Sequence, residues 1–310
     1  MFAEAKKILI IVGPTAVGKT ATALWLAQEF SGEIISCDSM QVYRGFDIGT
    51  DKPSLEERKK VRHHLIDFLD PSQQFSAADF AFLALEIAED IIARRHLPIV
   101  VGGTGLYHRA LTVGLFKGPG RDQALRQKLK EEARAFGLEK LYHKLRQIDP
   151  EYANKITPKD SIRIIRALEV YHKTGRPISE HFRLTKSPLQ ARGFIPGQIG
   201  LKLERKELYR RIEERVNRMF ERGLVAEVRK LLEQGLTEEA APFKGLGYRQ
   251  VLRYLKGEIS LEEAIELTKL ETRHYAKRQM TWFRKTPGLT WFQPTEKDKI
   301  RKYVKSFLAE

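Results

Sequence analysis

The chain has 310 residues, 42% of them hydrophobic and 31% charged, the balance of a globular protein with two domains or with one domain and a large insertion. Its single cysteine, Cys37, excludes a disulfide framework and a cysteine-rich zinc site and fits a reducing compartment. No targeting segment and no apolar run near the roughly 18 residues of a membrane helix are visible, which predicts a cytoplasmic protein without a membrane partner, and the net charge of +15 favours a polyanionic one.

The first element is a phosphate-binding loop, GPTAVGKT at residues 13–20. Apolar residues 8–12 predict a buried parallel strand before it and residues 21–27 a helix after it, which is the context that the motif requires. The glycines let backbone N–H groups turn toward an anion at the positive end of the helix. The predicted diphosphate-binding residues are Gly13, Pro14, Thr15, Ala16, Val17, Gly18, Lys19 and Thr20. We expect Lys19 to reach the outer phosphate and Thr20 to bind Mg²⁺; the motif leaves open whose diphosphate is held.

Two further strands are predicted to end beside this loop. Asp38 follows a second short strand, and Thr104 lies in a glycine-rich turn after another buried strand. Ligands of open α/β sheets bind outside the carboxyl ends of the strands, so we expect Asp38 and Thr104 to face the crevice of the phosphate loop. One more strand is predicted at 65–67. It follows His63 and His64, which lack a third ligand at the spacing of a metal site.

From about residue 118 the pattern changes to charged helices, and no strand is predicted again until 198–203. We therefore predict an α/β fold with two parts. Residues 1–117 and 198–310 form a phosphate-loop core, a parallel β-sheet flanked by helices, and residues 118–197 form an inserted all-helical domain.

Several arginines in the basic part of the chain are candidate anion ligands. Arg163 and Arg166 lie one turn apart in the insertion, among isoleucines, and Arg126 lies on an earlier helix. Arg215 falls at the edge of the apolar stripe of a helix predicted from about residue 207, where a cation needs an anionic partner. That partner is either an acidic side chain in a structural ion pair or a bound anion.

The last part of the chain is both basic and aromatic. Residues 1–120 carry 13 basic and 14 acidic side chains, whereas the rest carries 42 and 26. KGLGYRQ at 244–250 precedes a helix that Ser260 is predicted to cap and that ends in TRHYAKRQMTWFRK at 272–285. Cations interleaved with aromatic rings suit a nucleic-acid surface, although an amphipathic helix with snorkelling cations shows the same pattern.

These stretches, taken in order, resemble the bacterial tRNA dimethylallyltransferases, also called tRNA isopentenyltransferases. The resemblance covers nearly the whole chain and rests on GPTAVGKT, SCDSMQVYRGFDIGTDKP, HHLIDFLDPSQQFSAADF, VGGTGLY, IRIIRALEVY, LYRRIEERV, KGLGYRQ and TRHYAKRQMTWFRK. It implies transfer of a dimethylallyl group from dimethylallyl diphosphate to the exocyclic amine of the adenosine at tRNA position 37, 3′ of the anticodon, with release of pyrophosphate.

The resemblance also implies roles for the candidate residues. Asp38, ionised at neutral pH, would accept the proton of the amine, while Lys19, Thr20 with Mg²⁺, and Arg215 would stabilise the leaving diphosphate. The adenosine would be flipped out of its stack, past Thr104. The insertion would grip the anticodon stem-loop, and a monomer is favoured. The implied tRNA-binding residues are Asp38, Ser39, Met40, Gln41, Thr104, Arg126, Ile162, Arg163, Ile164, Ile165, Arg166, Lys244, Gly247, Tyr248, Arg249, Arg273, Lys277 and Arg278.

Two alternative functions remain. An ATP-dependent phosphate-loop kinase or NTPase acting on RNA or a nucleotide could use Asp67 or Asp70 as a second acidic motif, but it would leave the basic part of the chain without a role. A non-enzymatic RNA-binding protein would leave Asp38 without one.

Overall fold

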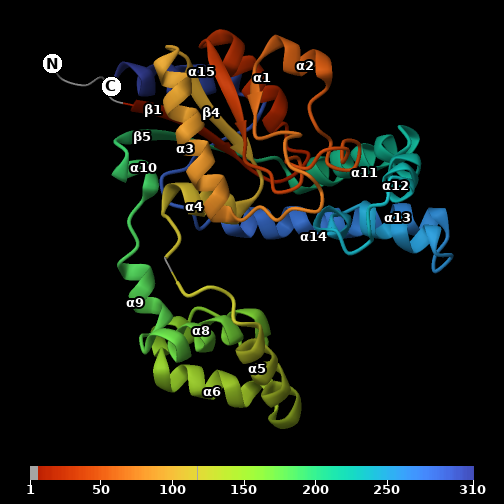
Figure 1. Ribbon diagram of the computed structural model, residues 1–310. Helices are drawn as coiled ribbons and strands as arrows, with labels where there is room; N and C mark the ends of the chain where they lie inside the picture. Colours follow the sequence, from red (N-terminus) through yellow and green to blue (C-terminus); the bar gives the residue numbers. More distant parts are fainter. Residues whose placement is uncertain (1–5, 117) are drawn as a thin grey trace. The chain divides into compact units, whose positions relative to one another are not determined.

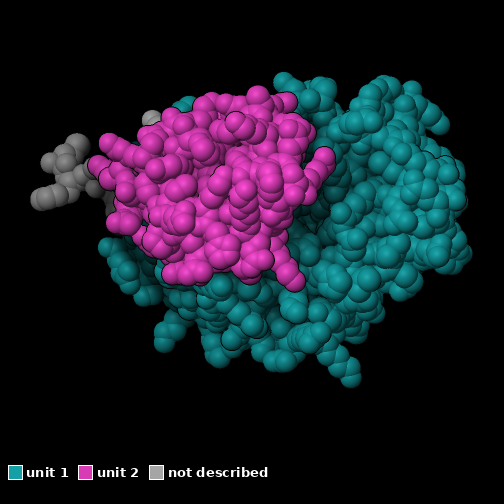
Figure 2. Space-filling view, turned by 90° about the horizontal axis from the view of Figure 1, so that it is seen from below, with its two compact units in different colours: residues 1–112, 188–310 teal, residues 113–187 magenta. Residues whose placement is uncertain are grey.

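The computed structural model describes residues 6–116 and 118–310 and divides into two compact units. Unit 1 contains residues 1–112 and 188–310, and unit 2 contains residues 113–187 (Figures 1 and 2). The division therefore falls five residues before the predicted start of the insertion and ten before its predicted end, 197.

Unit 1 is built on a parallel sheet with the strand order β3-β2-β4-β1-β5-β6. The strands of the described residues are β1 (Lys6–Val12), β2 (Gly32–Ser36), β3 (His63–His64), β4 (Leu97–Gly102), β5 (Phe194–Leu201) and β6 (Thr290–Phe292). Alternate side chains of β1 enter two different cores: Ile8 and Ile10 pack on one face of the sheet, and Leu9 and Ile11 pack on the other. Helices cover both faces, so the central strands are apolar along their length.

The helices of unit 1 supply these two cores and a third one. They are α1 (Lys19–Glu29), α2 (Leu55–Lys60), α3 (Ala77–Ala93), α4 (Gly105–Thr112), α10 (Pro188–Ala191), α11 (Arg205–Glu221), α12 (Leu224–Glu233), α13 (Tyr248–Leu255), α14 (Leu261–Phe283) and α15 (Lys297–Ala309), with a 3-10 turn, η1 (Ala241–Lys244). Side chains of α3 and α4 pack on one face of the sheet, and those of α1, α11 and α15 pack on the other. The third core joins α12 and α13 to the segment around Phe46. Capping boxes at Ser54, Ser76 and Ser260 start α2, α3 and α14, and the last of them confirms the cap predicted at Ser260.

The regular elements of unit 2 are all helices within its described residues. Its helices are α5 (Gln123–Phe136), α6 (Leu138–Ile148), α7 (Pro150–Ala153), α8 (Ser161–Thr174) and α9 (Ile178–Arg183), and they share one apolar core (Figure 1). Glu169 on α8 has no exposed surface. Its carboxylate forms ion pairs with Arg126 Nη2 of α5 at 2.8 Å and with Arg166 Nη1 of α8 at 2.5 Å. The pair with Arg126 joins α5 to α8, and two cations compensate the buried charge of Glu169.

Two predicted strands are corrected by the structure. Leu65 and Asp67 have φ values of 57° and 60°, which no strand accommodates, and the strand there is the histidine pair of β3. β5 runs from Phe194 to Leu201, whereas the sequence predicted a strand at 198–203. It includes Pro196: the Gln198 N–H, two residues on, points away from β1 to the Tyr303 hydroxyl, so the missing N–H of Pro196 lies on the same side, where pairing with β6 starts only at Ile199.

Within the described chain, no helix has both the length and the apolar character needed to cross a membrane.

Candidate active site

The phosphate loop lies between the end of β1 and the start of α1, as the sequence predicts. A side chain at Gly13 would place its Cβ 2.7 Å from the carbonyl oxygen of Leu201 on β5, and the backbone there has a φ of +154°. Gly18, the N-cap of α1, has a φ of +103°. Both positions therefore require glycine, and they hold the loop at the positive end of the helix.

Lys19 is the cation at the base of the loop. Its Nζ donates to the Pro14 carbonyl oxygen at 2.8 Å, and it lines the cavity described below. Burial lowers the pKa of Lys19 to about 8, and the nearby Arg215 guanidinium contributes to the decrease. A bound anion would reverse both effects, since it favours the charged form of the amine. Lys19 and Arg215 are therefore two neighbouring cations whose charges a bound anion would compensate.

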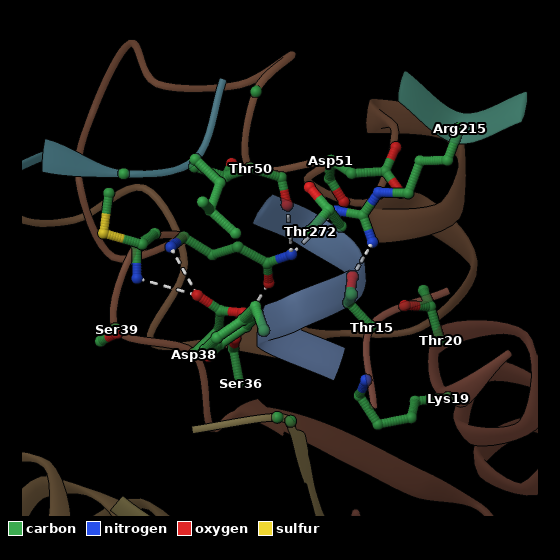
Figure 3. Close-up of a pocket in the computed structure, with 18 of the residues that line it drawn as sticks. Thr15, Lys19, Thr20, Ser36, Asp38, Ser39, Thr50, Asp51, Arg215 and Thr272 are labelled. Atoms are coloured by element: carbon green, nitrogen blue, oxygen red, sulfur yellow. Dashed lines mark hydrogen bonds and ion pairs between the residues drawn. The ribbon is translucent and has the colours of Figure 1, made fainter. Parts of the chain in front are cut away.

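Arg215 reaches the phosphate loop from α11. Its Nη1 donates to Thr15 Oγ1 at 2.6 Å, and its Nε lies 3.3 Å from Asp51 Oδ2 (Figure 3). Of the two partners that the sequence left open, the acidic residue is present as Asp51, and binding of an anion stays a prediction. The guanidinium also lies against the loop predicted to bind a diphosphate. Asp51 was not among the residues that the sequence singled out.

Asp38 lies two residues after the end of β2. Its Oδ1 accepts from the backbone N–H of Met40 at 2.8 Å and of Gln41 at 3.4 Å, which fixes the carboxylate in a tight turn (Figure 3). No described residue donates a hydrogen bond to Oδ2. Asp38 and Lys19 line the same cavity, so the carboxylate faces the crevice as predicted.

The turn after β4 presses against the turn that carries Asp38. A Cβ at Gly102 would lie 1.9 Å from the Cys37 carbonyl oxygen. Thr104 Oγ1 accepts from the Ser39 N–H at 3.1 Å, which fixes the two turns together. Residues at the carboxyl ends of β2 and β4 line the crevice, as expected of parallel strands, through Asp38, Gly102 and Gly103. Thr104, also predicted to face the crevice, lies outside the lining and joins the two turns instead.

Gln279 on α14 joins this wall to the phosphate loop. Its Oε1 accepts from the Thr15 N–H at 2.9 Å, and its Nε2 donates to the Gly103 carbonyl oxygen at 2.9 Å. The side chain is buried, and a Cβ at Gly103 would lie 2.3 Å from its Nε2. Sequence reasoning missed Gln279, because it is one uncharged residue in a basic and aromatic run. The sequence did offer one signal: Gln279 lies on the same face of α14 as Thr272 and Ala276, so a polar side chain was to be expected on a buried face.

A cavity of roughly 390 Å³ brings these groups together within unit 1, in the size range of small-molecule sites. The sequence-predicted residues that line it are Thr15, Lys19, Thr20, Asp38, Ser39, Met40, Gln41, Lys244, Tyr248, Arg249, Arg215 and Arg278. Predicted residues outside the lining are Gly13, Pro14, Ala16, Val17, Gly18, Thr104, Gly247, Arg273 and Lys277. Apolar lining comes from residues such as Ile34, Val101 and Val216, so the cavity has both a charged and an apolar wall.

Among the predicted tRNA-binding residues of unit 1, several have partners within the protein. Arg273 Nη1 lies 2.6 Å from Glu213 Oε1, and Arg249 pairs with Glu271. Tyr248 is buried in the third core, so only part of it can face a ligand. Lys277 and Arg278 are exposed on α14.

The predicted tRNA-binding residues of unit 2 also differ in their exposure and in their partners within the protein. Ile164 and Ile165 are buried in the core of the unit, whereas Ile162 is 82% exposed and Arg163 lies on the surface beside Asp160. Arg126 and Arg166 both bind the buried Glu169, so each arginine has an internal carboxylate partner, and their contact with tRNA stays a prediction.

The described residues contain no group of three or more His, Cys, Asp or Glu side chains that could hold a metal ion. The two neighbouring histidines are engaged otherwise: His63 Nδ1 lies 2.7 Å from the Val61 carbonyl oxygen, and His64 Nε2 lies 2.6 Å from Glu33 Oε2.

Comparison with known proteins gives one consistent result. The family model described as IPP transferase matches residues 41–286. The chain is 50% identical over 295 residues to a tRNA dimethylallyltransferase of Geotalea uraniireducens, covering 94% of this chain and 93% of that protein, and 47% identical over 308 residues to one of Geobacter metallireducens, covering 98% of each.

Solved structures agree. A full-length tRNA isopentenylpyrophosphate transferase from Bacillus halodurans is 42% identical with a TM-score of 0.73, over 98% of this chain and 97% of that one. A eukaryotic dimethylallyltransferase acting on tRNA is 32% identical with a TM-score of 0.76, over 97% of this chain and 77% of that one.

Proposed function

Because the chain belongs to the IPP transferase family, we propose that it transfers a dimethylallyl group from dimethylallyl diphosphate to the exocyclic amine of the adenosine at tRNA position 37, 3′ of the anticodon. One observation supports this reaction above the others: a phosphate loop, a cation and a carboxylate meet in a single cavity with an apolar wall. Such a cavity suits a donor with a charged end and an apolar end, together with an acceptor that must lose a proton.

The phosphate loop would hold the diphosphate of the donor. Lys19 and Arg215 lie on this side of the cavity, and Arg215 is already aimed at the loop through Thr15. As the allylic carbon–oxygen bond breaks, negative charge accumulates on the departing pyrophosphate. Cations that are fixed before the reaction stabilise that charge without reorganising.

Mg²⁺ fits this site through Thr20. Thr20 lines the cavity beside the loop, and the Ser/Thr hydroxyl at this position of the phosphate-loop motif is the one that binds Mg²⁺, with phosphate oxygens and water completing its shell. The described residues hold no cluster of carboxylates that would form a separate metal site. When bound, Mg²⁺ would neutralise part of the charge of the leaving group.

Asp38 would act as the general base. The amine nitrogen of the adenosine forms the new bond to the allylic carbon, the bond to the diphosphate oxygen breaks, and the amine proton passes to Asp38. Oδ1 is held by the turn, so Oδ2 is the oxygen that can take the proton. A stacked adenine cannot enter the cavity, so the nucleotide is flipped out of the anticodon loop.

The anticodon stem-loop would be bound outside the cavity by basic surfaces. In unit 1 the exposed cation Lys277 of α14 is suited to phosphates, next to Arg278 at the cavity lining, and in unit 2 the exposed Arg163 is suited to them. Ile162, exposed beside Arg163, offers an apolar contact instead. This partner places the protein in the cytoplasm, and we favour a monomer.

The kinase alternative is not favoured. Asp67 is held by Lys52 Nζ at 2.7 Å, and Asp70 caps its own turn through the Ser72 N–H at 2.9 Å, so neither carboxylate is presented to the phosphate loop.

The test is to incubate the protein with unmodified tRNA, Mg²⁺ and dimethylallyl diphosphate in the absence of ATP. Digestion of the tRNA should give dimethylallyl-adenosine from position 37, and tRNA with guanosine at that position should give none. ATP hydrolysis without a prenylated nucleoside would contradict the proposal.

A further inference from the structure

A carboxylate outside the cavity lining, Glu227 on α12, binds the backbone of a neighbouring segment. Its Oε2 accepts from the N–H groups of Asp47 at 3.1 Å and Ile48 at 2.8 Å. Its Oε1 accepts from the Gly49 N–H at 3.5 Å and from the Tyr248 hydroxyl at 2.7 Å. Hydrogen bonds to an ionised acceptor are about twice as strong as neutral ones, so this one side chain fixes three successive peptide units.

Tyr248 holds the same segment from the other side. Its hydroxyl accepts from the Gly49 N–H at 3.1 Å, and its ring leaves no room for a side chain, since a Cβ at Gly49 would lie 2.5 Å from it. The ring packs edge-on against the ring of Phe46, with the two ring centroids 4.9 Å apart. Burial, with the charge of Glu227, raises the pKa of Tyr248, so the hydroxyl stays protonated and donates to the carboxylate.

The far end of the segment is anchored by a buried lysine. Lys52 Nζ donates to the Tyr43 carbonyl oxygen at 2.6 Å, to Asp47 Oδ1 at 2.6 Å and to Asp67 Oδ1 at 2.7 Å. Between the two anchors lies Asp51, with a φ of +53°. A non-glycine residue holds such a conformation only where its surroundings fix it.

This anchored segment, residues 46–52, is what presents Asp51 to Arg215. The Asp51 carboxylate lies 3.3 Å from Arg215 Nε, and Arg215 Nη1 reaches Thr15 Oγ1 in the phosphate loop (Figure 3). We propose that Glu227 is a positioning residue of the prenyl transfer: it holds residues 46–52 in place, so that Asp51 aims Arg215 at the leaving diphosphate. Glu227 itself touches neither substrate.

The inference rests on the proposed function, but it can be tested without prenyl transfer, by measuring the affinity for inorganic pyrophosphate with calorimetry. We expect Glu227→Gln to weaken pyrophosphate binding by about tenfold, because the amide offers one acceptor and a competing donor to three N–H groups. Glu233→Gln, an exposed residue of the same helix, is the matched control and should bind as the wild type does.

The decisive measurement is a double-mutant cycle with Arg215→Ala. If Glu227 acts through Arg215, Glu227→Gln has no further effect on pyrophosphate binding once Arg215 is gone. A role confined to fold stability would instead lower the melting temperature and leave pyrophosphate binding by the folded protein unchanged, which would overturn the inference. The inference would also be overturned if the double variant lost affinity by the product of the two single losses, because the two residues would then act independently.

If Glu227→Gln does not fold, Tyr248→Phe replaces it in the cycle, because it removes a single donor from the same carboxylate and keeps the ring. A wild type that binds pyrophosphate but prenylates no tRNA overturns the proposed function alone.

Discussion

Arg215 Nη1 donates to Thr15 Oγ1 at 2.6 Å, a hydrogen bond between residues 200 positions apart in the chain. It joins α11 to the phosphate loop and places a guanidinium where a diphosphate would bind. Because Asp51 fixes the other edge of the guanidinium, the cation is oriented before any substrate arrives. Preorganised charge of this kind is effective on a leaving group, since it needs no rearrangement during the reaction.

The first prediction concerns this pair. Arg215→Ala should lower the turnover number by about 10²-fold and weaken binding of dimethylallyl diphosphate, because it removes charge stabilisation of the departing pyrophosphate. Thr15→Val should have a smaller effect, about tenfold, because it removes only the hydroxyl that orients the arginine. Steady-state prenylation kinetics measure both. Arg218→Ala, exposed on the same helix, is the control, and a normal rate for Arg215→Ala would contradict the assignment.

A pH dependence follows from Lys19, whose pKa is lowered to about 8 by burial and by Arg215. Below this pH the free protein carries the ammonium ion that a diphosphate needs, and above it the ammonium ion is lost. The dissociation constant for dimethylallyl diphosphate, measured without tRNA, should therefore be flat below about pH 8 and rise by up to tenfold per pH unit above it. Lys19→Met should bind weakly at every pH and lose this dependence. A flat profile for the wild type up to pH 10 would contradict the lowered pKa, and wild-type affinity in Lys19→Met would exclude Lys19 as a ligand.

Removing the proposed base should separate chemistry from tRNA binding. Asp38→Ala should lower turnover by about 10²- to 10⁴-fold and change the affinity for tRNA little, because the carboxylate acts on the amine proton. Single-turnover kinetics and a filter-binding assay distinguish the two quantities. Asp70→Ala, which alters an exposed carboxylate outside the cavity, should behave as the wild type does. An unchanged rate for Asp38→Ala would remove it as the base.

Arg163 of unit 2 should contribute to tRNA binding through its charge. Its guanidinium is half exposed, and its partner Asp160 lies 3.5 Å away, so it can still meet a phosphate. Arg163→Ala should weaken binding and flatten the dependence of log Kd on log salt concentration by about one unit. The binding constant at several salt concentrations gives the slope, and an unaltered slope would place Arg163 outside the interface.

Arg126, although predicted from the same pattern, should affect stability instead. Arg126→Ala leaves the carboxylate of Glu169 buried with one partner fewer, which should cost about 3 kcal/mol in the free energy of unfolding at pH 7. Burial alone would raise the pKa of Glu169, but hydrogen bonds from Arg126, from the Asp122 backbone and from Arg166 lower it to about 2.

The stability contributed by Glu169 is therefore fully present above about pH 4.5 and is lost as the pH falls toward 2. Urea unfolding at pH 7 and at pH 3 should show that the effect of Arg126→Ala shrinks in acid. An equal loss at both values would contradict the role given to this ion pair.

Local sequence predicted most of the fold and part of the site. The glycine loop between a buried strand and a helix, the cap at Ser260 and the placement of Asp38 after a strand end depend on interactions within a few residues, so they can be predicted directly from the sequence. The apolar stripe of α11 placed Arg215 at the edge of a core for the same reason.

Partners distant in the chain were decided only by the tertiary structure. Nothing near Arg126 indicates that it pairs with Glu169, 43 positions away. Nothing near Asp51 indicates that it holds Arg215, and nothing near Gln279 indicates that it meets the phosphate loop. β6 escaped detection as well, since its three residues form a strand only because β5 offers them an edge. The sequence determined which residues could bind charge, through residue type and short-range geometry. The tertiary structure determined which charges are neutralised internally and which remain for a ligand, because a buried ion is stable only beside its partner and that proximity is set by packing.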